Sequence, residues 1–326
     1  MRILITGGAG FIGSNFVKYV LNDPVSGISH VTVLDKLTYA GNIDNLVAVA
    51  QRPDFSFIKG DICDERLVTQ LVEEVDAVVN FAAESHVDRS ISNSDSFVKT
   101  NIVGVQVILD ALKMAKGEKR LLQVSTDEVY GSIPVGSWSE NSPLLPNSPY
   151  SATKASGELL TRAYHRTFGL DVITTRCSNN YGPYHYPEKL IPLFITNLIE
   201  GKKIPVYGSG NNVRDWLHVD DHCRGIYAAL TRGKPGQVYN IGGGEELTNL
   251  QITEFILDAM GLDANFVEFV EDRKGHDFRY SVNWCKIQTE LGYEPQIKFQ
   301  DGLRDTIRWF EENENWWKPL KIRSGL

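Results

Sequence analysis

Short apolar runs alternate with longer amphipathic stretches along most of the chain, and this pattern predicts the fold. The runs are rich in valine, isoleucine and leucine and end at glycine, asparagine or acidic residues, as buried strands do. They predict strands at 3–5, 31–34, 55–58, 77–81, 121–125 and 172–176, with 238–241 as a strand that could return to the same sheet. Apolar residues at helical spacing predict helices that include 15–21, 65–72, 102–115 and 248–260, the last capped by Thr248. This alternation indicates an α/β fold with a doubly wound parallel sheet.

The composition of the sequence changes after about Cys177, where prolines and tyrosines are frequent and the alternation of strand and helix patterns weakens. We therefore predict two domains. The first covers residues 1–178 and takes back about 212–243. The second is a smaller, discontinuous lobe of mixed α/β structure within 179–326.

A glycine-rich turn, Thr6–Ser14, joins the first predicted strand to the first predicted helix. Gly10 lets the backbone approach a pyrophosphate, Gly13 lets the helix pack closely on the sheet, and the first N–H groups of the helix face the phosphate. Asp35 ends the second strand, where a carboxylate can accept hydrogen bonds from a ribose and repel a 2′-phosphate. This arrangement predicts a Rossmann-type domain that prefers NAD to NADP, and Lys36 works against that preference.

Other strand ends could also face this cofactor. Asp61 follows the third strand, where it could either face the adenine or cap the helix at 65–72. Ala82 and Ala83 follow the fourth strand, and small residues suit a chain that passes close under a cofactor.

Candidate chemistry follows the fifth strand, because ligands of doubly wound sheets lie at the carboxyl ends of the strands. Thr126 lies there, and a helix that starts at Pro149 would place Tyr150 and Lys154 on one face. An ammonium and a nicotinamide ring near Tyr150 should lower its pKa from about 10, so that the phenolate can take a hydroxyl proton while hydride leaves the same carbon. Thr126 would hydrogen-bond the reacting oxygen. A solvated helix face is the structural alternative for Tyr150 and Lys154.

Together, Thr6–Ser14, Asp35, Thr126, Tyr150 and Lys154 resemble the extended short-chain dehydrogenase/reductase family, which acts on nucleotide sugars. Five stretches further resemble the 4,6-dehydratases of that family that act on dTDP-glucose, and the resemblance covers essentially the whole chain; they are 37–42, 86–90, 125–131, 176–183 and 188–192. The resemblance implies an NAD-binding set of Gly7, Gly10, Phe11, Ile12, Gly13, Asp35, Lys36, Thr38, Asp61, Ile62, Ala82, Ala83, Ser85, Thr100, Tyr150, Lys154 and Asn180. It implies a substrate-binding set of Ser85, His86, Asp88, Thr126, Asn179, Glu188, Lys189, Leu190, Pro205, Val206, Tyr207, Arg214, Asn249, Arg273, His276 and Tyr280. Lys274 departs from the family pattern, which usually has proline there.

The presence of Asp127 and Glu128 distinguishes between two possible activities, those of a 4-epimerase and a 4,6-dehydratase. A 4-epimerase only oxidises one carbon and returns the hydride to it. A 4,6-dehydratase must also remove the carbon-5 proton and expel the carbon-6 hydroxyl, which takes a base and an acid. The resemblance implies that Glu128 is the base and Asp127 the acid. Because adjacent residues on a strand face opposite sides, both reach one substrate only if the chain has already left the strand, and Gly131 favours this. Their structural alternative is a pair of surface acids in a loop.

The composition and net charge of the chain limit the classes of partner that it is expected to bind. The chain has 326 residues, 42% of them hydrophobic, and a formal net charge of −8, which disfavours nucleic acids and membrane surfaces as partners. Four dispersed cysteines, Cys63, Cys177, Cys223 and Cys285, indicate reduced thiols. The first residues do not read as a signal peptide, and we expect a cytoplasmic enzyme. The run His218–His222 matches no zinc pattern, so we predict no metal site. The resemblance implies a homodimer formed through the helix at 102–115 and the helix of Tyr150.

Two classes of alternative remain. One is another NAD-dependent nucleotide-sugar enzyme, either a 4-epimerase or a UDP-sugar 4,6-dehydratase, since thymine and uracil differ by one methyl group worth about 1 kcal/mol. The other is a non-catalytic protein that senses NAD.

Overall fold

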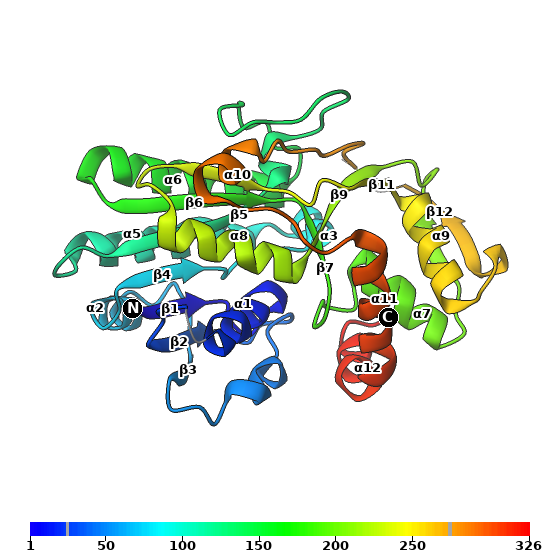
Figure 1. Cartoon of the computed structure of the whole chain (residues 1–326), viewed down its shortest axis with the longest axis horizontal. Helices are drawn as coiled ribbons and strands as arrows, with labels where there is room; N and C mark the ends of the chain where they lie inside the picture. Colours follow the sequence, from blue (N-terminus) through cyan, green and yellow to red (C-terminus); the bar gives the residue numbers. More distant parts are fainter. Residues whose placement is uncertain (24–25, 273–275) are drawn as a thin grey trace.

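A seven-stranded parallel sheet forms the centre of the computed structural model, which describes residues 1–23, 26–272 and 276–326 (Figure 1). The strand order is β10-β6-β5-β4-β1-β2-β3, and every neighbouring pair is parallel. The strands are β1 (Arg2–Thr6), β2 (His30–Asp35), β3 (Phe55–Lys59), β4 (Ala77–Asn80), β5 (Arg120–Thr126), β6 (Asp171–Cys177) and β10 (Val238–Ile241). The predicted doubly wound sheet is therefore confirmed, including the return of 238–241 to its edge.

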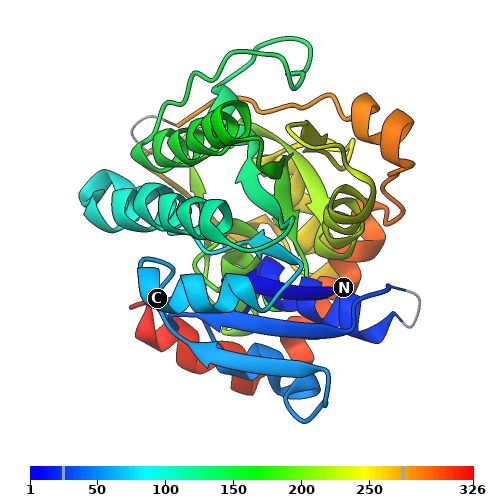
Figure 2. The same cartoon turned by 90° about the vertical axis from the view of Figure 1, so that its left-hand side faces the viewer.

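Helices cover both faces of this sheet, which explains why its strands are apolar on both sides. In β1, Ile3 and Ile5 pack with Phe16 of α1, whereas Leu4 between them packs on the other face with Ile108 of α5. Figure 2 shows α5 (teal) and α6 (green) together on one face and α8 (yellow-green) on the other. The helices around the sheet are α1 (Phe11–Asn22), α2 (Glu65–Glu73), α5 (Val105–Met114), α6 (Pro149–Phe168), α8 (Val219–Arg232) and α10 (Cys285–Leu291).

Helix boundaries follow the capping residues, with two differences from the sequence prediction. Thr248 caps its helix through a capping box, as predicted. Asp64 rather than Asp61 caps α2, because its carboxylate accepts the N–H of Leu67. The helix predicted at 102–115 begins earlier, since α4 (Asp95–Val98) continues through a π-helical turn (Lys99–Gly104) into α5.

The smaller lobe lies beyond the carboxyl ends of the central strands, on the right in Figure 1. It contains a three-stranded sheet, β11-β9-β7, and the two-stranded sheet β12-β8. Its elements are β7 (Asn179–Tyr181), α7 (Leu190–Ile199), β8 (Ile204–Tyr207), β9 (Val213–His218), β11 (Glu246–Thr248), α9 (Asn249–Met260), β12 (Val267–Val270), α11 (Phe299–Glu312) and α12 (Glu314–Arg323). The predicted boundary at residue 178 falls between β6 and β7. Within the predicted return at 212–243, α8 and β10 lie on the central sheet, whereas β9 pairs in the smaller lobe.

Short helical segments complete the chain: η1 (Ile43–Val49), α3 (Val87–Ser92), η3 (Asp127–Tyr130) and η4 (Ala264–Phe266). Among the described residues, no helix combines the length and apolar character needed to cross a membrane.

Candidate active site

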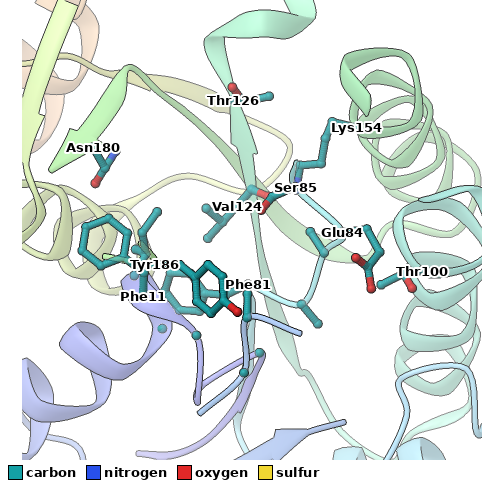
Figure 3. Close-up of a pocket in the computed structure, with 18 of the residues that line it drawn as sticks. Phe11, Phe81, Glu84, Ser85, Thr100, Val124, Thr126, Lys154, Asn180 and Tyr186 are labelled. Carbon is teal, nitrogen blue, oxygen red and sulfur yellow. The ribbon is translucent and has the colours of Figure 1, made fainter. Parts of the chain in front are cut away.

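A cavity of about 350 Å³ runs along the carboxyl ends of the central strands and reaches the smaller lobe. Every residue of the predicted NAD-binding set lines it, and so do Thr126, Asp127, Glu128, Tyr150 and Lys154. Figure 3 shows Phe11 at one part of this cavity, with Thr126 and Lys154 at another. One continuous space therefore joins the glycine turn to the candidate chemistry.

The glycine turn is a tight cradle that side chains would block. A Cβ on Gly7 would lie 2.6 Å from the backbone nitrogen of Ala82, and one on Gly13 would lie 2.4 Å from the Gly7 carbonyl oxygen. Gly10 caps α1 without a side-chain hydrogen bond, so the first N–H groups of the helix stay available to an anion. The Phe11 ring stacks on His185 with centroids 4.2 Å apart. The residues present therefore fit a dinucleotide.

Asp35 is buried at the end of β2, where it accepts hydrogen bonds from the N–H groups of Ala9 (2.9 Å) and Leu37 (2.7 Å). Burial raises the pKa of Asp35, and the two hydrogen bonds lower it by less, so the net shift is upward. The neighbouring Lys36 forms an ion pair with Asp61 at 2.8 Å. Because that cation is already paired, it attracts a 2′-phosphate less than the sequence alone indicates, which favours NAD.

Asp127 and Glu128 both face the cavity because the chain turns out of the sheet at this point. β5 ends at Thr126, and residues 127–130 form a 3-10 turn. The Thr126 hydroxyl accepts the N–H of Glu128 at 3.3 Å, and Gly131 ends the turn with φ +77°. The prediction that the chain leaves the strand here is confirmed.

The environment of Asp127 favours its protonated form. Its side chain is buried, and among the described residues Oδ2 has no hydrogen-bond partner. Oδ1 accepts a hydrogen bond from Thr126 at 3.2 Å. Burial, followed by the nearby carboxylates of Glu128 and Asp215, raises the pKa of Asp127 well above its ordinary value. Glu128 is only partly buried. The two adjacent carboxyls therefore occupy different environments, as an acid and a base require.

Tyr150 and Lys154 lie on the cavity side of α6. Lys154 extends toward β5, where its Nζ donates to the Val124 carbonyl oxygen at 2.7 Å (Figure 3). Burial lowers the pKa of Lys154 to about 8. Burial also raises the pKa of Tyr150, and the negative charges of Glu128, Cys177 and Asp127 add to this, whereas a hydrogen bond with Thr126 lowers it. The predicted lowering of the Tyr150 pKa requires a bound nicotinamide ring and stays a prediction, whereas desolvation dominates in the protein without that ring and raises the pKa.

Part of the predicted substrate set lies at the same cavity, namely Ser85, Thr126, Asn179, Glu188, Lys189 and Leu190. Lys189 Nζ donates to the Ser85 carbonyl oxygen at 3.1 Å. Glu188 accepts a hydrogen bond from Arg89 at 2.9 Å and lies 3.7 Å from His86. His86 caps α3, which also carries Asp88, and neither residue lines the cavity.

The other predicted substrate residues gather in the smaller lobe, away from the cavity lining: Pro205, Val206 and Tyr207 on β8, Arg214 on β9, Asn249 at the start of α9, and His276 and Tyr280 beyond β12. The Arg214 guanidinium lies over the Tyr280 ring, 4.4 Å from its centroid. His276 is 2.6 Å from a carboxylate oxygen of Asp272. Arg273 and Lys274 lie outside the described residues.

Several residues that line the cavity are absent from the predicted site sets. They are Tyr39, Glu84, Cys177, Ser178, His185, Tyr186 and Trp216. Glu84 is held by Asn101 of the π-helical turn, whose side chain bonds both the N–H and the carbonyl oxygen of Glu84 at 3.0 Å. Cys177 is the last residue of β6, so the rule that ligands lie at strand ends would have found it.

The run His218–His222 serves the scaffold. His218 accepts the N–H of Asp220, Asp221 accepts the N–H groups of Gln296 and Ile297, and His222 hydrogen-bonds Asn180. No group of three or more potential metal ligands occurs among the described residues.

The fold and the site define a dinucleotide-dependent enzyme of nucleotide-sugar chemistry, and the chain belongs to the family described as GDP-mannose 4,6 dehydratase, whose model matches residues 4–306. Within that family it is similar to a dTDP-glucose 4,6-dehydratase of Streptomyces niveus, with 57% identity over 98% of this chain and 96% of the relative. A dTDP-glucose 4,6-dehydratase of Escherichia coli is 44% identical over 98% of this chain and 96% of its own length.

Solved structures agree with this assignment. The dTDP-glucose 4,6-dehydratase DesIV of Streptomyces venezuelae, with NAD and TYD bound, superimposes with a TM-score of 0.97 at 56% identity, covering 98% of this chain and 100% of that one. A UDP-glucuronic acid 4-epimerase of Bacillus cereus has a TM-score of 0.89 at 30% identity, covering 96% of this chain and 99% of that one. The same fold therefore supports both 4,6-dehydration and 4-epimerisation, so the residues of the site, and not the fold, distinguish the two reactions.

Proposed function

We propose that this protein is an NAD-dependent dTDP-glucose 4,6-dehydratase, which converts dTDP-glucose to dTDP-4-keto-6-deoxyglucose. The observation that carries the proposal is the placement of Asp127 and Glu128 in one cavity with Tyr150 and Lys154. Oxidation and return of hydride at one carbon would need neither carboxyl group. Elimination of water needs both a base and an acid, and a 4-epimerase is therefore disfavoured.

Each residue has one proton to hold or move. Tyr150 takes the proton of the carbon-4 hydroxyl, and Thr126 hydrogen-bonds the reacting oxygen. Glu128 then takes the carbon-5 proton, which the neighbouring ketone has made acidic. Asp127 gives a proton to the departing carbon-6 hydroxyl, which leaves as water. Bound NAD would accept the hydride from carbon 4 and return it to carbon 6, and Glu128 would return a proton, exchanged with solvent, to carbon 5, so the cycle is redox-neutral.

The electrostatics support these roles. Burial raises the pKa of Asp127, which favours the protonated form that a general acid needs. The raised pKa of Tyr150 means that its phenolate depends on added positive charge. The ammonium of Lys154 and an oxidised nicotinamide ring would supply that charge within the same cavity.

The nucleotide half of the substrate belongs to the smaller lobe in this proposal. Arg214, Asn249 and His276 would bind the diphosphate and nucleoside, and Tyr207 would lie beside the base. Preference for dTDP over UDP is supported by the dTDP-glucose 4,6-dehydratases that resemble this chain over nearly its whole length.

We also propose that the protein is a cytoplasmic homodimer whose interface is formed by α5 and α6. These two helices pack side by side on one face of the sheet. They and the preceding turn expose large apolar side chains, namely Val103, Met114, Leu159 and Phe168. Sedimentation of the wild type against Leu159→Glu would test the interface, and an unchanged mass would refute it.

The activity is tested by incubating the protein with NAD and dTDP-glucose in deuterated water and measuring the mass of the product by mass spectrometry. We expect a product that has lost one water and carries one solvent deuteron at carbon 5. Conversion to the galactose isomer without loss of water would instead assign a 4-epimerase. Faster turnover of UDP-glucose than of dTDP-glucose would refute the proposed substrate. NAD binding without any turnover would favour the sensing role.

A further inference from the structure

Glu158 and Arg176 form a buried ion pair directly behind the candidate active site. Glu158 lies on α6, one helical turn beyond Lys154. Its Oε2 accepts hydrogen bonds from Nε (2.8 Å) and Nη2 (2.7 Å) of Arg176 on β6. The two residues are only 4% and 5% exposed. Charges buried this deeply are costly unless they are paired, and each of these two charges is paired with the other.

The same arginine reaches the turn that carries the two carboxyls. Arg176 Nη1 donates to the Tyr130 hydroxyl at 2.6 Å, and that hydroxyl donates to Asn240 Oδ1 at 2.8 Å. The guanidinium also lies 4.6 Å from the centroid of the Tyr130 ring. Tyr130 is the last residue of η3, whose first two residues are Asp127 and Glu128. The ion pair therefore connects α6 to the η3 turn.

The ion pair uses only one carboxylate oxygen of Glu158, and Lys154 lies one helical turn earlier on the same helix. Among the described residues, Oε1 of Glu158 has no hydrogen-bond partner although it is buried. The titratable groups that act on Lys154 are Glu158 on α6 and Cys177 on β6, whereas the carboxyls of η3 act on Tyr150, one helical turn before Lys154. Of these, Glu158 is the foremost group that favours the ammonium against desolvation.

We propose that the Glu158–Arg176 pair is a positioning unit that balances the charge of Lys154 and holds the η3 turn in place. Lys154, Glu158 and Arg176 alternate in charge as cation, anion and cation. Without Glu158, two cations would share a dry site, and Lys154 would lose its proton at lower pH. Without Arg176, Glu158 would act on Lys154 alone, and Lys154 would keep its proton to higher pH. The catalytic part of this inference rests on the proposed function, whereas the protonation of Lys154 does not.

Two variants with opposite expected effects test the charge balance. The titration of Lys154 is followed by NMR of ¹³C-labelled lysine in the full-length protein without substrate, with the signal assigned by its loss in Lys154→Met. We expect Glu158→Gln to lower the titration midpoint by about one pH unit or more, and Arg176→Gln to raise it. Asp171→Asn is the matched control, because it breaks a different ion pair of β6, the one that Asp171 forms with Arg120 on β5. It should leave the Lys154 midpoint unchanged.

The pH–rate profile connects this titration to turnover. We expect the alkaline limb of kcat to move in the same direction as the Lys154 midpoint in each variant. Tyr130→Phe, which keeps both charges, should leave the midpoint unchanged and slow loss of water more than formation of reduced cofactor. Midpoints that stay fixed, or that move in the same direction in Glu158→Gln and Arg176→Gln, would overturn the proposal. Should Arg176→Gln fail to fold, an unshifted midpoint in Glu158→Gln alone overturns it. A wild type that titrates as expected without dehydrating dTDP-glucose would refute only the proposed function.

Discussion

Replacing Asp127 by asparagine should separate oxidation of the sugar from loss of water. The asparagine side chain has nearly the same shape and keeps an oxygen that can accept the hydrogen bond from Thr126. It cannot give a proton to the departing hydroxyl. Thr126, Tyr150 and Lys154 remain, so oxidation at carbon 4 should continue.

The expected magnitude follows from the role of a general acid, which typically contributes about 10²–10⁴ in rate. This corresponds to about 3–5 kcal/mol in the barrier for loss of water. Asp127 is almost fully buried at 2% exposure, so bulk water has little access to replace it as the acid. We therefore expect the upper half of this range. Reduced cofactor should accumulate, because the step after oxidation is blocked.

The assay mixes the variant with NAD and dTDP-glucose and follows reduced nicotinamide by absorbance and loss of water by mass spectrometry. In deuterated water, Asp127→Asn should still return substrate labelled at carbon 5, because Glu128 remains. The matched variant Glu128→Gln should return unlabelled substrate. Loss of water at the wild-type rate in Asp127→Asn would refute the assignment of the acid. Absence of both reduced cofactor and label would show that Asp127 acts before elimination.

The same substitution should stabilise the fold at alkaline pH. An unfolded aspartate has a pKa of about 3.9, and the pKa of Asp127 in the fold is well above that value. A raised pKa means that stability is full below about pH 4 and falls as pH rises toward the folded value. Asparagine carries no such penalty. The melting temperature of Asp127→Asn should exceed that of the wild type at about pH 8, and the difference should vanish near pH 4.

Three further outcomes are expected. Tyr150→Phe should lower turnover by about 10²–10⁴ while NAD still binds in a fluorescence titration; near-normal turnover would remove Tyr150 from the mechanism. Gly13→Ala, which places a Cβ 2.4 Å from the Gly7 carbonyl oxygen, should weaken NAD binding by about tenfold or more, and equal affinity would show that the turn can relax. Asp61→Asn frees the cation of Lys36 and should raise the affinity for NADP relative to NAD, measured by calorimetry. An unchanged ratio would mean that Lys36 does not reach the ribose.

Local patterns predicted the elements that depend on local sequence. The strands were readable because each is an unbroken apolar run, and the exit of the chain from β5 was readable because Gly131 follows so closely. Asp61 could be read from the sequence as a cap for the helix at 65–72, but its carboxylate accepts the N–H of Cys63, and Asp64 caps α2 instead.

Features that depend on distant contacts escaped prediction. The π-helical turn that contains Asn101 is held by Glu84 and Thr153, which lie far away in sequence. The direction of the Tyr150 pKa depends on how much water the fold excludes, which no spacing of residues reveals. The placement of Arg214 over Tyr280 likewise follows from packing in the smaller lobe.

The η3 turn has a consequence for how activities can diverge on this scaffold. Thr126, Asp127 and Glu128 are consecutive, and the turn presents all three to one cavity. In the proposed mechanism, oxidation depends on Thr126 and on Tyr150 and Lys154 of α6, whereas elimination depends on Asp127 and Glu128. A gene for a simple oxidoreductase of this fold could therefore acquire a dehydration step through a few neighbouring codons, with the cofactor site and the helix of Tyr150 left untouched. Loss of a single residue from this turn would remove the new step just as readily.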